Sequence, residues 1–84
     1  MYQKQDRVNL EIRQRDNFTC QLCGTYESWK AFPVHHIDYN KQNSSNNNLV
    51  LLCNNCHPKV NFSRNKWEFL LTCLSELIHH KVVL

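Results

Sequence analysis

The chain has 84 residues, a formal net charge of +3, and hydrophobic side chains at 42% of its positions. A chain this short buries too little apolar surface to be stable without a disulfide, a metal or a partner, so a structural metal is expected on energetic grounds. One glycine and two prolines argue against a disordered chain. The mild basic excess is compatible with a polyanionic partner without requiring one.

Neither a signal peptide nor a membrane span is expected. No apolar run follows the polar start from Met1 to Arg7, and no segment is long enough to cross a bilayer. We therefore expect a cytoplasmic (intracellular) protein that does not contact membranes. In a reducing cytosol, paired cysteines are more often metal thiolates than disulfides.

The first half of the chain predicts a helix followed by two strands. Residues 2–14 form a polar stretch without glycine or proline, with apolar residues at the spacing of a short amphipathic helix. Residues 31–37 have the β-branched and aromatic character of a strand. After a loop rich in Asn and Ser over residues 38–48, the apolar run at 49–52 predicts a buried strand.

Two helices are expected in the second half. A brief helix through residues 56–62 places its proline in the first turn, where the missing N–H costs little. A longer helix over about 66–81 carries an apolar stripe, and Cys73 within it is expected to be a buried small hydrophobe without a role. The exposed-looking Val82-Val83-Leu84 suggests a homodimer or a larger-complex partner through this helix. The stripe consists of Trp67, Leu70, Leu71, Leu74, Leu77 and Ile78.

Two CxxC pairs are the strongest signal in the chain: Cys20 with Cys23, and Cys53 with Cys56. Each CxxC turn presents two thiolates to one ion, so two turns complete the tetrahedral ligand set of a structural zinc. Gly24 after the first pair can adopt the positive φ that such a turn needs. We predict a four-cysteine zinc site that contributes on the order of 10 kcal/mol to folding, with redox pairs or another metal as the alternatives.

Three histidines lie between or beside the cysteine pairs. His57 and Asn61 are four residues apart, so on a helix they share one face and can both reach one cation. His35 and His36 are neighbours on the expected strand and point to opposite sides, so one can bind metal while the other stays free to accept a proton from water. Asn48 directly precedes the second strand, where its amide can tie the loop to the backbone near His36.

The motifs run in the order Arg15-Asp16-x-x-x-Cys20-x-x-Cys23-Gly24, Val34-His35-His36-Ile37, and Asn48-Leu49-x-x-Leu52-Cys53-x-x-Cys56-His57. This order resembles the HNH endonucleases of the ββα-metal (His-Me finger) superfamily, over about residues 13–62. The resemblance implies a small α+β zinc-stapled domain. Its ββα-metal core would be a two-stranded hairpin plus a helix, flanked by N- and C-terminal helices within a single domain over residues 1–84.

The resemblance also implies a role for each reacting group. His36 is the implied general base, His35 and His57 are the implied metal ligands, and Asn48 is the residue that holds the hairpin loop and the base in place. Asn61 stands where relatives carry a further ligand, often histidine and sometimes asparagine. The implied activity is phosphodiester hydrolysis by a metal-dependent DNA endonuclease, either nicking or double-strand cleaving. Imidazole and amide ligands allow Mg²⁺, Mn²⁺, Ni²⁺ or Zn²⁺ as the catalytic cation.

The expected partner is double-stranded DNA, with low sequence specificity because no helix offers a convincing row of base-contacting side chains. Candidate phosphate contacts, each of which is individually more often just a solvated side chain, are Lys30, Lys41, Lys59, Arg64 and Lys66. The alternative is a catalytically inactive zinc module that binds nucleic acid or protein. Such a module would keep the cysteines but would not need His36 or Asn48. His79 and His80 receive no role, because histidines at a helix end complement its dipole.

Overall fold

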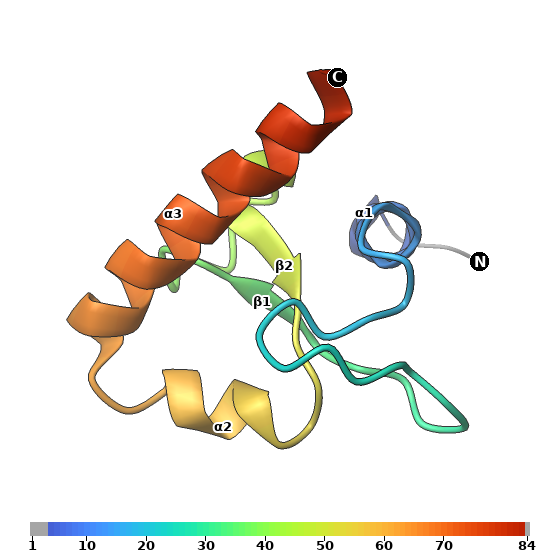
Figure 1. The fold of residues 1–84 in the computed structure, drawn as a ribbon, viewed down its shortest axis with the longest axis horizontal. Helices are drawn as coiled ribbons and strands as arrows, with labels where there is room; N and C mark the ends of the chain where they lie inside the picture. The colour runs from blue at the N-terminus through green and yellow to red at the C-terminus, as the bar shows by residue number, and fades with distance from the viewer. Residues whose placement is uncertain (1–3, 84) are drawn as a thin grey trace.

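The computed structural model describes residues 4–83, with side chains over residues 7–77, so the expectations for Ile78 and for Val82-Val83-Leu84 lie outside the described side chains. The elements follow in the order α1 (Lys4–Arg15), β1 (Val34–His36), the 3₁₀ turn η1 (Asn46–Asn48), β2 (Leu49–Leu51), α2 (Cys56–Val60) and α3 (Arg64–Val83). The expected α+β arrangement is confirmed. In Figure 1 the hairpin lies in the middle, with α1 on one side, α3 on the other and α2 below. No helix among the described residues combines the length and the apolarity needed to cross a bilayer.

The hairpin is short and antiparallel. His35 lies opposite Val50, and His36 lies opposite Leu49. The four residues 49–52 are at most 1% exposed, which explains why this strand is a continuous apolar run instead of an alternating one. In β1, by contrast, a buried His35 lies between half-buried neighbours. Strand β2 therefore forms the centre of the core, and strand β1 carries the two adjacent histidines.

A buried ion pair fastens the end of α1 to the hairpin. The Arg15 guanidinium donates to both carboxylate oxygens of Asp16, at 2.8 and 3.0 Å, and the Asp16 side chain is fully buried. Asp16 Oδ2 also accepts the backbone N–H of Leu51 at 3.0 Å. Arg15 donates in addition to the carbonyl oxygens of Asn46 and Leu49, both at 2.7 Å. This pair therefore satisfies backbone groups of β2 that face α1.

The α3 helix covers the other side of the core. Leu71 is 1% exposed and belongs to the central apolar cluster, and Trp67 and Leu74 pack against that cluster. The hydroxyl of Ser75 donates to the carbonyl oxygen of Asn47 at 2.7 Å, which fixes the helix to the turn before β2.

The outward face of α3 differs from the sequence prediction in two respects, the apolar stripe and Cys73. Leu70 is 42% exposed and Leu77 is 61% exposed, so these members of the predicted stripe do not reach the core. Cys73 is exposed, and the prediction that it is buried is wrong. The physical reason is the small width of the hairpin, which contacts only the narrow strip of α3 that is centred on Leu71.

The buried anchor leads to a stability prediction. Asp16→Ala leaves the Arg15 guanidinium and the Leu51 N–H without their buried partner, so we expect the free energy of unfolding to fall by about 3 kcal/mol. Urea unfolding of the zinc-loaded protein, followed by circular dichroism, measures the change. Arg7→Ala, at an exposed position of the same helix, is the matched control and should change stability by less than about 0.5 kcal/mol. Equal effects of the two substitutions would mean that the anchor contributes nothing.

Candidate metal centre and histidine pocket

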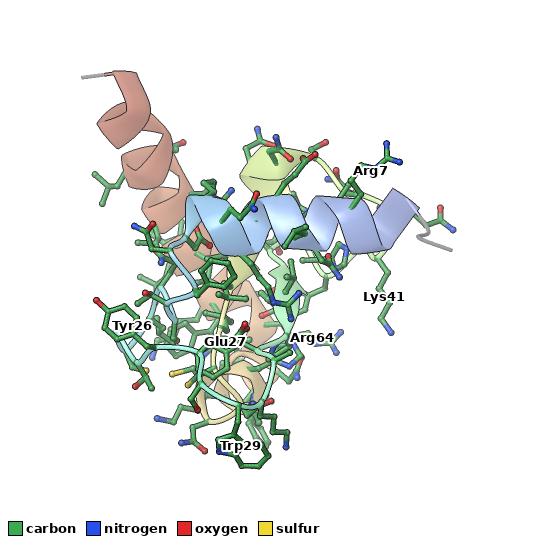
Figure 2. All side chains as sticks on the ribbon, turned by 90° about the vertical axis from the view of Figure 1, so that its right-hand side faces the viewer. Arg7, Tyr26, Glu27, Trp29, Lys41 and Arg64 are labelled. Carbon is green, nitrogen blue, oxygen red and sulfur yellow. The ribbon has the colours of Figure 1, made fainter. Side chains whose placement is uncertain are left out.

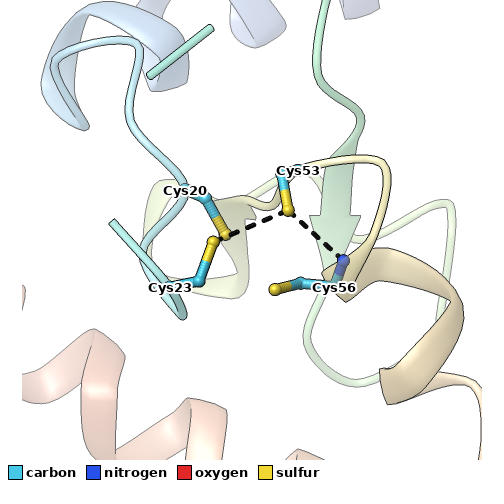
Figure 3. A group of neighbouring side chains, drawn as sticks. All are labelled: Cys20, Cys23, Cys53 and Cys56. Atoms are coloured by element: carbon cyan, nitrogen blue, oxygen red, sulfur yellow. Dashed lines mark hydrogen bonds between the residues drawn. The ribbon is translucent and has the colours of Figure 1, made fainter. Parts of the chain in front are cut away.

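The four cysteines of the two CxxC pairs converge on one point, as Figure 3 shows. Their sulfur atoms all lie within 4.8 Å of one another, and the sulfurs of Cys23 and Cys53 are 3.7 Å apart. Tetrahedral zinc with bonds of about 2.3 Å requires sulfur–sulfur separations of roughly 3.8 Å. The four cysteines can therefore hold a metal such as zinc.

Both cysteine turns have backbone hydrogen bonds suited to a metal site. The N–H of Cys20 donates to the carbonyl oxygen of Thr25, and the N–H of Gly24 donates to the carbonyl oxygen of Cys20, each at 2.8 Å. Gly24 has a φ of 84°, the positive value expected of it. In the second turn the N–H of Cys56 donates to Cys53 Sγ at 3.3 Å. Backbone N–H groups aimed at sulfur stabilise the thiolate form that binds metal.

Two of the thiols have shifted acidities. A hydrogen bond with the Thr25 hydroxyl lowers the pKa of Cys23 to about 6, so this exposed sulfur is largely thiolate at neutral pH. Burial raises the pKa of Cys56. Since only thiolates bind zinc, metal binding at this cluster releases the proton of the Cys56 thiol.

A separate pocket of about 520 Å³ opens between β1 and α2. Its described lining contains imidazole, amide, phenol and cationic groups but no carboxylate, and consists of Val34, His35, His36, Tyr39, Lys41, His57, Asn61 and Arg64. A pocket with fixed cations and no acid suits an anionic ligand. It also brings together the histidines and the asparagine that the sequence singled out as ligands.

His35 and His57 contact each other edge-on in this pocket, with ring centroids 5.4 Å apart and ring planes at 69°. His35 is 4% exposed, and its Nε2 is buried without a hydrogen-bond partner among the described residues. Burial, followed by the nearby His57, lowers the pKa of His35 to about 4, so the ring is neutral at pH 7. A neutral imidazole nitrogen without a hydrogen-bond partner can bind a metal ion. Asn61 lines the same pocket, and its Nδ2 donates to the carbonyl oxygen of His57 at 3.4 Å.

His36 lines the pocket as a half-buried residue, and its Nε2 is also buried without a partner among the described residues. Asn48, by contrast, has its amide fully occupied. Its Oδ1 accepts the N–H of Asp38 at 3.1 Å, while its Nδ2 donates to Asp38 Oδ1 at 3.0 Å and to the carbonyl oxygen of Asn43 at 2.9 Å. The carbonyl oxygen of Asn48 accepts the N–H of Ile37 at 2.8 Å. These bonds hold the loop directly after His36.

The five predicted phosphate contacts divide into three groups. Lys41 and Arg64 line the histidine pocket. Lys30 and Lys59 line a second hollow beside the cysteine cluster. Lys66 lies over the indole ring of its neighbour in α3, 5.6 Å from the ring centroid. Of these five residues, Lys41 and Arg64 are therefore the ones that could contact a phosphate in the histidine pocket.

Tyr39 is a site residue that sequence analysis missed. Its ring packs edge-on against His35 at a centroid distance of 4.9 Å, and its hydroxyl donates to the carbonyl oxygen of Val60. The Arg64 guanidinium lies 4.8 Å from its ring centroid. Burial raises the pKa of Tyr39, so the phenol remains a hydrogen-bond donor. The sequence feature that could have indicated a role for Tyr39 is that it is the one aromatic residue in the polar loop over residues 38–48.

Comparison with known proteins gives a family for this arrangement. A protein-family model described as HNH endonuclease matches residues 20–63, which include both cysteine pairs and the three pocket histidines. Among curated proteins, the Zorya protein ZorE of Escherichia coli is 35% identical over 54 residues, which cover 62% of this chain and 15% of that protein. The chain thus spans only a small part of this relative. No solved structure gives a significant match.

The structural role of the cysteine cluster can be tested by substitution, with a cysteine outside the cluster as the control. Cys53→Ser removes one ligand, and we expect loss of both bound zinc and the folded state, because metal binding supplies folding free energy here. Elemental analysis of the purified protein and far-ultraviolet circular dichroism measure the two effects. Cys73→Ser removes an exposed thiol outside the cluster and should retain one zinc per chain. A folded, zinc-free Cys53→Ser protein would contradict the structural role.

Proposed function

This chain belongs to the HNH endonuclease family, whose domains are generally nucleases that bind nucleic acid, and from this we propose that it is a metal-dependent DNA endonuclease. The single observation that carries the proposal is the histidine pocket. Three imidazoles line one hollow without a carboxylate, and the Nε2 atoms of His35 and His36 have no partner among the described residues. A zinc module that only binds other molecules has no need of such a pocket.

We assign the general base to His36. Its Nε2 accepts a proton from a water molecule, whose oxygen attacks the phosphorus in line with the departing 3′ oxygen. The new bond joins the water oxygen to phosphorus, and the bond between phosphorus and the 3′ oxygen breaks, leaving a 5′ phosphate and, after proton uptake from solvent, a 3′ hydroxyl. Asn48 acts indirectly, because its bonds to Asp38 and Asn43 hold the loop that follows the base.

We assign cation binding to His35, His57 and Asn61. The two neighbouring histidine rings and the unpaired Nε2 of His35 fit a divalent cation. Such a cation, when bound, supplies Lewis-acid stabilisation of the scissile phosphate and of the leaving oxygen. This donor set accepts Mg²⁺, Mn²⁺, Ni²⁺ or Zn²⁺. Tyr39 packs against His35 and so restricts the orientation of that ring.

We assign substrate contact to Lys41 and Arg64, which are the cationic side chains lining the pocket. These groups bind phosphate oxygens, which carry no sequence information, so low sequence specificity on double-stranded DNA is expected. One histidine pocket among the described residues acts on one phosphodiester at a time. We therefore propose nicking as the elementary reaction, with double-strand cleavage arising from two such events.

The general base is tested by substitution. His36→Ala is expected to lower the rate of supercoiled-plasmid nicking by at least about 100-fold, in line with the loss of general-base catalysis, while DNA binding and zinc content persist. Agarose gel electrophoresis over time measures the rate in the presence of Mg²⁺ or Mn²⁺. His79→Ala, at a histidine to which no role is assigned, is the control and should nick at the wild-type rate. Equal cleavage by His36→Ala would reject the assigned base, and a wild-type protein that binds DNA without nicking would favour the inactive zinc module.

The assigned phosphate contacts are tested by salt dependence, in a His36→Ala background that prevents cleavage. Arg64→Ala is expected to weaken duplex binding and to reduce the slope of log affinity against log salt by about 1, because one phosphate contact is lost. Fluorescence anisotropy at several salt concentrations measures the slope. Lys66→Ala, two residues along α3 but outside the pocket, should leave the slope unchanged. Identical slopes for both variants would remove Arg64 from the phosphate contacts.

A further inference from the structure

A second hollow of about 400 Å³ lies against the cysteine cluster, and Cys23, Cys53 and Cys56 form part of its lining. The segment around α2 borders both hollows: His57 and Asn61 line the histidine pocket, while Asn55 and Lys59 line the second hollow. A nucleic-acid strand bound at the histidine pocket therefore has a second recess available across a single short helix. The proposed cleavage reaction does not involve the residues of this second hollow.

The most unusual side chain at the second hollow is Trp29, which is 90% exposed while lining it. Its loop is closed at the base by Glu27, whose Oε2 accepts the N–H of Phe32 at 2.7 Å and the Arg13 guanidinium at 3.1 Å. Figure 2 shows Trp29 projecting from the lower end of the molecule, well away from Tyr26. The hydrogen bonds of Glu27 thus fix the base of the loop, and the indole at its tip is exposed and can contact a ligand.

The charges around the hollow favour an uncharged ligand. Among the described side chains no carboxylate lines it, and the cations in its lining are Lys30 and Lys59. Four thiolates and one zinc ion carry a net charge of about −2, which these two lysines offset. A phosphate would gain little in such a neutral recess. A flat aromatic group can instead stack on the indole and meet the amides of Asn54 and Asn55, which also line the hollow.

We propose that this hollow binds an unpaired nucleobase of the DNA substrate, stacked on Trp29. The inference rests on the proposed nuclease function and narrows its substrate class to DNA with at least one unpaired or extruded base near the cut. A helix about 10 Å wide separates the two hollows, which corresponds to roughly three nucleotides of a strand with about 3.4 Å per nucleotide. Stacking accepts every base, so this contact agrees with low sequence specificity.

The first experiment observes Trp29 directly. The chain contains two tryptophans, so Trp67→Phe combined with His36→Ala leaves Trp29 as the only indole in a protein that does not cleave. Titration with a single-stranded oligodeoxynucleotide is expected to quench the fluorescence and to protect the indole from acrylamide. A fully paired duplex of the same sequence should produce clearly less quenching, because its bases are not available to stack. Equal quenching by the duplex, or none by the single strand, would overturn the proposal.

The second experiment measures affinity with a fluorescein-labelled single strand in the His36→Ala background. Trp29→Ala is expected to weaken binding about tenfold, with an unchanged salt slope, while Trp29→Phe retains most of the affinity. Tyr26→Ala is the matched control, because Tyr26 is 73% exposed but does not line the hollow, and it should bind like the parent. Equal losses for Trp29→Ala and Tyr26→Ala would overturn the proposal.

The nucleobase site and the nuclease function can be contradicted separately. If the wild-type protein nicks plasmid DNA but Trp29 neither responds to single strands nor contributes to their affinity, the nucleobase site is wrong and the nuclease function stands. If the wild-type protein neither nicks nor binds any DNA, the proposed function fails, and the nucleobase site fails with it.

Discussion

The convergence of four thiols on one point is the constraint on which the other parts of this structure depend. The first cysteine turn follows α1, and the second lies between β2 and α2, so one metal ion bound by both turns would join the segments on either side of the hairpin. A backbone bond of 3.0 Å from Gln21 to the carbonyl oxygen of Leu51 reinforces this junction. Strands of three residues are too short to form a stable hairpin in water by themselves. A metal ion bound by the four cysteines would therefore hold together the segments that line both hollows.

The two hollows beside α2 differ in the charge that they present, and this difference underlies the different ligands proposed for them. The histidine pocket has Lys41 and Arg64 with no opposing acid in its described lining, so it attracts anionic groups. In the second hollow, thiolates bound to a metal ion would offset the charges of Lys30 and Lys59. One recess is thus suited to the backbone of a nucleic acid and the other to a base.

Features that depend on residue spacing could be predicted from the sequence. The two CxxC pairs predicted the metal cluster, and the apolar run at 49–52 predicted the buried strand, because each signal is local and has few alternative interpretations. Features that depend on the packing of distant segments could not be predicted. In the sequence, Asp16 is recognised only as part of the Arg15-Asp16 motif, which does not reveal that its carboxylate is the partner of Arg15 and of the Leu51 N–H. The contacts of Tyr39 depend on a positive φ of 62°, which no propensity would assign to a tyrosine. The roles of the individual pocket residues stay predictions.

The outward face of α3 has a practical consequence. Cys73 is exposed there, and Phe69 and Leu77, one helical turn to either side, are 69% and 61% exposed. If two molecules meet along this apolar strip, their thiols come close enough for dissolved oxygen to join them in a covalent crosslink, which a reducing cytosol would prevent. A mass measured on aerated protein can therefore report a dimer made during purification, and the native association state is the one observed with reductant present.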